Sequence, residues 1–238
     1  MVSEPMLGMI RLQWWQEAMD ELFDPNATVR RHEVTLALEV LLADTPLSKS
    51  HFTALIEAHK QELESLPFVT ITDFEHYSEQ TSGALLLLAL EILGVKDKTL
   101  QHMARHTGIA WSIITYLRTA HRDLPRNFCV IPQDILQTHG LSLDRFGSED
   151  FAIRFQSAVK TPSETAESHL THASSLLASV AKPLRKQAKP VWLLLPLARF
   201  YLDAIRQKDG DILRQALPAA PSPLTLLSLW FKAARNRV

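Results

Sequence analysis

Residues 107–132 carry an apolar pattern typical of a helix packed against other elements on most of its surface. Apolar side chains recur there at intervals of three and four residues, and two more widen the apolar face: Ile109, Ile113, Tyr116 and Leu117, with Trp111 and Ile114. Pro125 lacks the backbone N–H that a helix interior needs. The segment therefore predicts a buried helix that breaks at Pro125.

Similar patterns predict helices along the rest of the chain, and no convincing strand alternation occurs. In the first half, the expected helices are one opened by Ser3 and Pro5, one over 31–43, one capped by Ser48, and one over 73–93 with a Thr72/Glu75 capping box and a stop at Gly94. A further helix begins at Asp97 or Thr99. In the second half, the expected helices are one capped by Ser148, one opened by Ser163, one over 191–207 with a kink at Pro196, and one from Ser222-Pro223. With 238 residues, 46% hydrophobic content and no linker-like stretch, the chain predicts one all-α domain over 1–238.

Charge and cysteine content exclude several classes of protein. A net charge of −1 gives no general electrostatic reason to bind nucleic acid. Cys129 is the single cysteine, so an internal disulfide and a cysteine-based zinc site are excluded, and its apolar neighbours predict burial. The longest apolar run, 84–90, is far shorter than the roughly 20 residues that span a bilayer.

The end of the 107–132 helix offers a cluster of charge. Arg118, Arg122 and Arg126 are expected to gather around Asp123. Such a cluster suits an anion, but the solvated last turn of a core helix also favours cations because of the helix dipole. Both interpretations remain open from spacing alone.

Two further patterns each allow more than one interpretation. His102 and His106 lie four residues apart and would suit a metal ion, but no third ligand follows at a recognisable spacing. Near the C-terminus, aromatic residues stand beside basic ones: Trp230 and Phe231 with Lys232, Arg235 and Arg237. That helix could dock on a membrane surface or a partner, or its basic end could simply complement the helix dipole.

Several residues of 107–132 match a known motif in register: Gly108, Ala110, Arg118, Asp123 and Pro132. Together they resemble the second aspartate-rich region of the squalene/phytoene synthase family, with the pattern G-x-A-x-Q-x-x-N-x-x-R-D-x-x-x-D. Three positions depart from it: Ser112 replaces the glutamine, Thr115 the asparagine and Thr119 the first aspartate. The D-x-x-x-D of the family is thus Thr119-x-x-x-Asp123 here.

Other segments extend this resemblance over nearly the whole chain. They are the Arg11, Leu12, Trp14 and Trp15 segment, the segment with Tyr77 and Gly83, and the segment with Asp134 and Gly140. The resemblance implies the isoprenoid synthase fold, a helical bundle with a central cavity. In the synthases, the segment that matches Arg11, Leu12, Trp14 and Trp15 follows the first aspartate motif. The resemblance therefore predicts a domain without the family's N-terminal helices.

The resemblance also defines what the altered motif would lose. In the synthases, two D-x-x-x-D motifs hold Mg²⁺ ions against the diphosphates of two prenyl substrates, and acids four residues apart share one helix face. A threonine hydroxyl is neutral and does not replace the lost charge. Asp123 is then a weak metal ligand at best, and Tyr77, Arg118, Arg122 and Arg126 are the candidate substrate-binding residues.

Within the family, the segments around 91–97, 113–119 and 131–142 are most similar to a catalytically degenerate branch that includes a mitochondrial assembly factor for respiratory complex I. The first hypothesis is therefore a non-catalytic assembly or binding factor without a cofactor, with respiratory complex subunits as partners. The alternative is a Mg²⁺-dependent prenyltransferase that condenses two prenyl diphosphates. A third is a module that binds a prenyl lipid without chemistry. Cytoplasm is expected for a bacterial source and mitochondria for a eukaryotic one.

Overall fold

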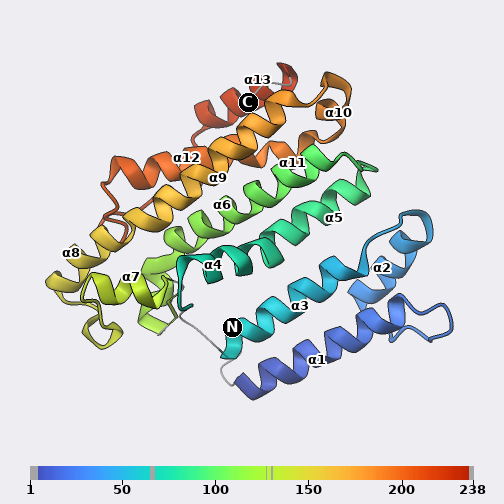
Figure 1. Ribbon diagram of the computed structural model, residues 1–238, viewed down its shortest axis with the longest axis horizontal. Helices are drawn as coiled ribbons and strands as arrows, with labels where there is room; N and C mark the ends of the chain where they lie inside the picture. Colours follow the sequence, from blue (N-terminus) through green and yellow to red (C-terminus); the bar gives the residue numbers. More distant parts are fainter. Residues whose placement is uncertain (1–4, 65–67, 127, 130, 236–238) are drawn as a thin grey trace.

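The computed structural model describes residues 5–64, 68–126, 128–129 and 131–235, and this part of the chain is helical with no strand. The elements, labelled in Figure 1, are α1 (Pro5–Leu22), α2 (Glu33–Asp44), α3 (Lys49–Glu64), α4 (Ile71–Ser78), η1 (Glu79–Gly83), α5 (Ala84–Ile92), α6 (Lys98–Asp123), η2 (Leu124–Arg126), α7 (Gln133–Thr138), η3 (Leu143–Arg145), α8 (Glu149–Ala158), α9 (Lys160–Ser179), α10 (Lys182–Gln187), α11 (Lys189–Trp192), α12 (Leu194–Gln207) and α13 (Pro223–Arg235). The all-α prediction is confirmed, and α6 ends just before Pro125, as expected.

Helix α6 lies at the centre of the main bundle (Figure 1). Its most extensive contact is with α9, and α4, η1, α5 and α12 also pack against it. Large apolar side chains fill the spaces between these helices, including Phe74, Phe155, Leu170 and Trp192, all almost fully buried. Burial at about 25 cal/mol per Å² of apolar surface makes this packing the main source of stability.

Two glycines let the central helices approach closely. A Cβ built on Gly108 of α6 would lie 2.5 Å from both the Cα and the N of Gly83, at the end of η1. The short turn between α5 and α6 is closed by Gly94, whose φ of +67° is a left-handed conformation that glycine adopts without steric cost. Gly83 thus has a packing role, because it allows α6 to approach closely.

The expected helix over 73–93 differs from the structure in two ways. The capping box is formed by Thr70 and Asp73: Thr70 Oγ1 accepts from the Asp73 N–H at 3.2 Å, and Asp73 Oδ2 accepts from the Thr70 N–H at 2.9 Å. The helix therefore begins at Ile71, and the predicted Thr72/Glu75 box was wrong. It is also not continuous, because η1 is a π-helical turn at the point where it crosses α6.

Two other helix boundaries were predicted imprecisely for reasons that involve proline. Helix α9 starts at Lys160, before the predicted Ser163. Pro162 fits in its first turn, because a backbone N–H at that position would have no acceptor within the helix and its absence costs nothing. The expected 191–207 helix is divided at Leu193 into α11 and α12. Pro196 cannot donate to the carbonyl of Trp192 four residues earlier, so the ladder is interrupted one turn before the proline.

Helix α12 carries both buried apolar residues and charged ones. Arg199 and Arg206 both form ion pairs with Glu167 of α9, so one face of α12 carries charge at the α9 interface. The expected C-terminal helix is present as α13, but the side chains of Trp230, Lys232 and Arg235, and all of Arg237, lie outside the described residues.

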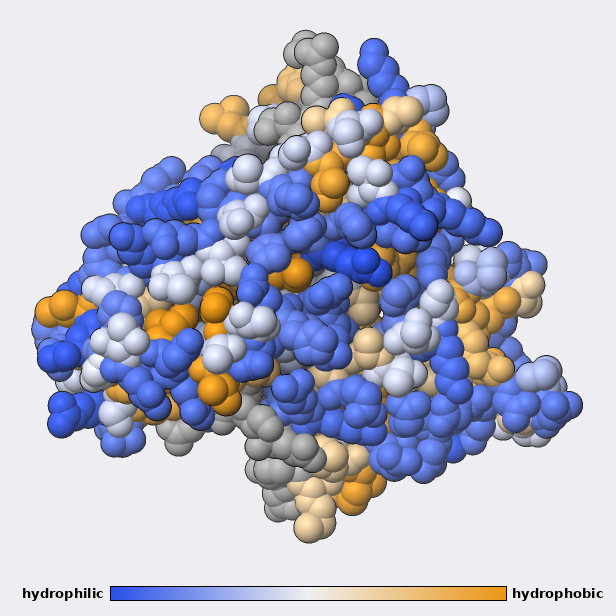
Figure 2. All heavy atoms as spheres, in the orientation of Figure 1, coloured by the Kyte–Doolittle hydropathy of each residue, from blue (hydrophilic) through white to orange (hydrophobic). Residues whose placement is uncertain are grey.

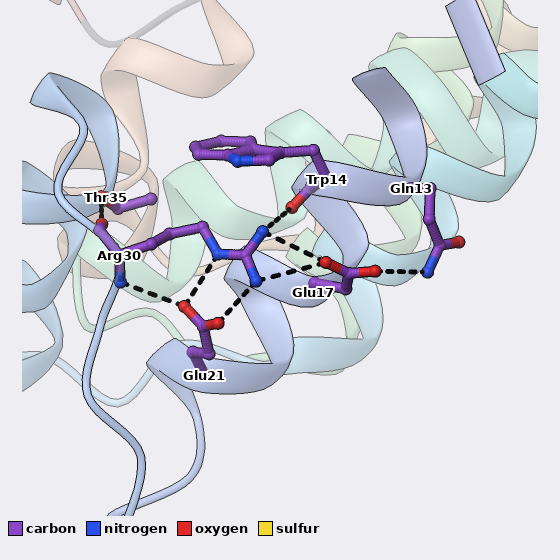
Figure 3. Close-up of polar contacts among 6 residues, drawn as sticks. All are labelled: Gln13, Trp14, Glu17, Glu21, Arg30 and Thr35. Atoms are coloured by element: carbon purple, nitrogen blue, oxygen red, sulfur yellow. Dashed lines mark hydrogen bonds and ion pairs between the residues drawn. The ribbon is translucent and has the colours of Figure 1, made fainter. Parts of the chain in front are cut away.

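Helices α1 to α3 form a separate layer with its own small core around Ala18, Met19 and Ile56 (Figure 1). Trp14 and Trp15 pack against this core, and their two rings meet edge to face with centroids 4.9 Å apart. Figure 3 shows Arg30, from the α1–α2 connection, extending back beneath the Trp14 ring and bonding to Glu17 and Glu21. The tryptophan pair is therefore a packing element.

We expect Gly108→Ala to destabilise the protein strongly, since its methyl group would overlap the backbone at Gly83. Overpacking of this kind costs about 1–3 kcal/mol. Gly83→Ala is the matched control, because the nearest atom to its new Cβ is Glu79 Cγ at 3.5 Å. Thermal unfolding of the two variants measures the difference. Equal melting temperatures would mean that α6 and η1 do not approach as closely as described.

Candidate functional site

The C-terminal half of α6 meets α3 and α4 in a buried network of hydroxyl and carboxylate groups. The Tyr77 hydroxyl donates to Glu62 Oε2 at 2.8 Å and lies 2.7 Å from the Tyr116 hydroxyl. His59 also bonds Glu62 Oε2, at 2.8 Å. Tyr77, a predicted substrate-binding residue, is thus fully engaged with protein partners. Neither Glu62 nor the polar role of Tyr116 was predicted from the sequence.

Burial raises the pKa of both phenols. For Tyr77 the shift is large, with Tyr116 and Glu62 adding to it. For Tyr116, burial and the nearby Glu62 carboxylate raise the pKa to about 12. Both hydroxyls therefore stay protonated at neutral pH. They donate hydrogen bonds and do not act as bases.

A small cavity adjoins this network at the end of α6. Its lining includes Tyr116, Asp123, Phe128 and Cys129, and its volume is about 10 Å³. That is roughly the space of one water molecule. Cys129 is buried, as predicted, and burial raises the pKa of its thiol to about 11, so it is a poor nucleophile.

The predicted gathering of three arginines around Asp123 is not what the structure contains. The Arg118 guanidinium stacks on the Tyr201 ring, 3.4 Å from its centroid, and donates to the Ala219 carbonyl at 3.3 Å. It thereby joins α6 to α12 and the following segment. The reason is that Arg118 and Asp123 are five residues apart, which places them on different faces of a helix with 3.6 residues per turn.

The altered aspartate pair also has little capacity to bind ions. Thr119 Oγ1 donates back to carbonyls of its own helix, to Thr115 at 3.2 Å and to Tyr116 at 3.3 Å. Asp123 is largely buried, and its Oδ1 accepts from Arg122 Nε at 3.0 Å. Arg126 is exposed in η2. One carboxylate that already has a cation partner does not fit the Mg²⁺ cluster of the synthases.

Histidines from two helices meet on another side of α6. His106 Nδ1 lies 2.7 Å from Nδ1 of His169 on α9, and His169 Nε2 lies 2.7 Å from Glu75 on α4. His106 thus pairs with a histidine 63 positions away in the sequence, and His102, four residues before it, is not its hydrogen-bond partner. Among the described residues, no group of three or more His, Cys, Asp or Glu side chains could hold a metal ion.

The family model for squalene/phytoene synthase matches residues 1–223, which is most of the chain. The chain belongs to the squalene/phytoene synthase family. It is 30% identical to a Bos taurus protein named NADH dehydrogenase (ubiquinone) complex I, assembly factor 6, over 99% of this chain and 69% of that protein. It is 23% identical to a 15-cis-phytoene synthase of Synechococcus elongatus, over 86% of this chain and 68% of the synthase.

The fold is likewise that of the family. The crystal structure of a squalene synthase from Alicyclobacillus acidocaldarius superimposes with a TM-score of 0.70 at 22% identity, covering 84% of this chain and 74% of the synthase. The expected isoprenoid synthase fold is therefore confirmed. Within the described part of the chain, no helix has the length and apolar character needed to cross a membrane.

We expect Tyr77→Phe to lower the free energy of unfolding by about 1–2 kcal/mol, because it removes a buried hydrogen bond to a carboxylate. Tyr201→Phe is the control: its hydroxyl makes a long, 3.4 Å bond to the Ala219 carbonyl, so its loss has a smaller effect. Urea unfolding of both variants provides the comparison. A Tyr77 variant as stable as wild type would show that the network contributes nothing.

Proposed function

We propose that this chain is a non-catalytic member of its family that acts in the assembly of respiratory complex I. The observation that carries the proposal is the state of the aspartate pair: Thr119 bonds its own helix, and Asp123 is paired with Arg122. A prenyl synthase needs carboxylates there that face metal ions and diphosphates. The proposed activity is binding of a protein client.

The similarity to proteins named complex I assembly factor 6 supports the choice of client. Those relatives match nearly the full chain at 30% identity, while the phytoene synthase matches less of it at 23%. The partners would be subunits of NADH dehydrogenase. In a eukaryote this work would take place in mitochondria, and in a bacterium on the cytoplasmic side of the inner membrane.

The alternative is a Mg²⁺-dependent prenyltransferase, and the described residues support it less well. Of its predicted substrate-binding residues, Tyr77 is bonded to Glu62 and Arg118 is stacked on Tyr201. Arg122 and Arg126 are the exposed cations that remain near Asp123. The 10 Å³ cavity beside Asp123 is also far too small for a prenyl chain, which argues against a lipid ligand at that position.

Deletion of the gene in its native host, followed by rescue, separates the two functions. We expect the deletion to lower the amount of assembled complex I on native gels, and Asp123→Asn to restore it as well as wild type does. Asp123 is the one carboxylate of the motif, so a prenyltransferase would lose its activity with this variant.

Purified protein gives the matching biochemical control. Neither wild type nor Thr119→Asp should release diphosphate from farnesyl or geranylgeranyl diphosphate with Mg²⁺, since the Asp123 carboxylate that would share the ion is paired with Arg122. Diphosphate release by wild type, or normal complex I in the deletion strain, would contradict the proposed function.

The client is part of a membrane complex, and α13 has a surface suited to peripheral membrane contact. Leu224, Leu226 and Leu227 are each at least half exposed. Figure 2 shows hydrophobic residues at the end of the molecule where α13 lies. We expect flotation with vesicles that contain anionic lipid, and its loss in Leu224→Ser/Leu227→Ser. Equal flotation of that variant would exclude α13 as the contact.

A further inference from the structure

We propose that one end of the helical bundle, where α5 turns into α6 and α9 is followed by α10 and α11, is a basic surface that binds the phosphate groups of anionic lipids. The inference rests on the proposed function and deepens it, since the proposed client is part of a membrane complex. It concerns elements other than α13 and adds charge to the apolar contact expected there. Five lysines define this lysine surface, four of them exposed and the last partly so: Lys96, Lys98, Lys182, Lys186 and Lys189.

Hydrogen bonds hold the two lysine segments side by side. Gln187 Nε2 of α10 donates to the Leu93 carbonyl in the α5–α6 turn at 2.7 Å, and α11 contacts α5. Arg185 donates to the carbonyls of Ala178 and Val180 at 3.1 and 3.0 Å, so it fixes α10 against the end of α9. Figure 1 shows α10 beside the α5–α6 turn at one end of the bundle. The turn and the short helices therefore form one continuous surface.

The charge of this surface is not compensated by acidic side chains. Within the described part of the chain, none of the five lysines has an ion-pair partner. Three lysines elsewhere do form such pairs: Lys49 with Asp20, Lys60 with Glu57 and Lys160 with Glu164. Residues 168–202 contain no aspartate or glutamate. Asp97, in the turn, accepts from the Leu100 N–H at 2.9 Å as the cap of α6. Positive charge is thus concentrated at one end of a chain whose net charge is −1.

Helix stability does not account for the positions of these cations. Lys98 is the first residue of α6, where the positive end of the helix dipole disfavours a cation. Lys182 and Lys186 lie four residues apart in α10, a spacing at which like charges on a helix repel each other. An anionic ligand relieves both kinds of repulsion.

The composition of the lysine surface fits a lipid bilayer better than a protein partner. Lysine acts as a flexible point charge for phosphate, whereas bidentate recognition of carboxylates uses the planar guanidinium of arginine. Residues 168–202 expose no large hydrophobic side chain, and Ile92 of α5 is half exposed, so a protein would find little apolar surface as an anchor. Clusters of roughly four to eight basic residues are typical of surfaces that bind anionic lipids.

Binding through this end also orients the molecule. Helix α6 starts at the lysine surface with Lys98 and ends at Asp123, and its 26 residues span about 39 Å. The Debye length at physiological ionic strength is about 8 Å, so the field of the headgroups does not reach the Asp123 end. That end therefore remains free of the bilayer.

The test is flotation of the full-length protein with vesicles of phosphatidylcholine alone and of phosphatidylcholine mixed with phosphatidylglycerol. We expect binding to the anionic vesicles, and its loss when salt is raised from about 0.1 M to about 1 M, which shortens the Debye length from about 10 Å to about 3 Å. Each basic residue near an anionic surface contributes roughly fivefold to affinity. Lys182→Gln/Lys186→Gln/Lys189→Gln should therefore bind about 100-fold more weakly, and Lys96→Gln/Lys98→Gln about 30-fold.

A second triple variant, Lys60→Gln/Lys160→Gln/Lys208→Gln, is the matched control, because it removes the same charge from other parts of the chain. We expect it to bind as wild type does. Melting curves show whether each variant is folded, and the turn pair and the helix triple test the surface independently of each other. Inorganic phosphate should compete no better than chloride at equal ionic strength. Stronger competition would indicate a site for a free anion and overturn the assignment to lipid.

Equal binding to neutral vesicles, or an equal loss in the lysine triple and its control, would overturn the proposal. A lysine triple that floats normally but fails to restore complex I in the deletion strain would overturn it too, since the lysines would then contact an acidic protein. The proposed function is tested separately. Rescue by a wild-type protein that does not float would remove the lipid inference alone, and normal complex I in the deletion strain, with flotation as expected, would remove the proposed function alone.

Discussion

The close approach of Gly83 to Gly108 fixes how the central helices are aligned, and most of the site geometry depends on that alignment. The η1–α5 segment and helix α6 form a helical hairpin, and they run antiparallel from the turn at Gly94. Tyr77 lies six residues before Gly83 and Tyr116 eight residues after Gly108, so both stand at a similar height along the hairpin. A side chain at Gly108 that pushed the helices apart would lengthen the 2.7 Å contact between the two hydroxyls.

The same helix places its polar residues Tyr116 and Arg118 in contacts within the protein. Arg118 lies on the Tyr201 ring, where stacking partly balances the loss of hydration of its cation. Glu62 receives two hydrogen bonds from neighbouring side chains. Aromatic rings occupy the space between α4 and α6, with Phe68, Phe74 and Tyr77 packed in sequence against Tyr116. Polar groups that are already satisfied in this way have little left to offer a substrate.

The sequence predicted what local rules determine. Apolar periodicity located most helices, and Pro125 and Gly94 marked two ends correctly. It did not predict which residues meet across helices. Arg118 with Tyr201 and His106 with His169 are pairs that depend on the rotation and register of separately packed helices. Capping boxes are ambiguous for a related reason: Thr70 and Thr72 both precede an acidic residue by three positions, and only backbone geometry distinguishes them.

The separate small core of α1 to α3 has a consequence for how the molecule opens. Among the described residues, Ala18, Met19 and Ile56 are the buried members of that small core, while α3 is also the helix that contacts η1 and α5 of the main bundle. Units with few buried apolar groups unfold locally at a lower free energy than the global transition. The α1–α2 pair, held by the Arg30 cluster in Figure 3, would then exchange its amide hydrogens well before α6 does. Release of that pair would expose the face of α3 that carries Ile56 and Leu63, while Glu62 on the bundle side keeps its bond to Tyr77.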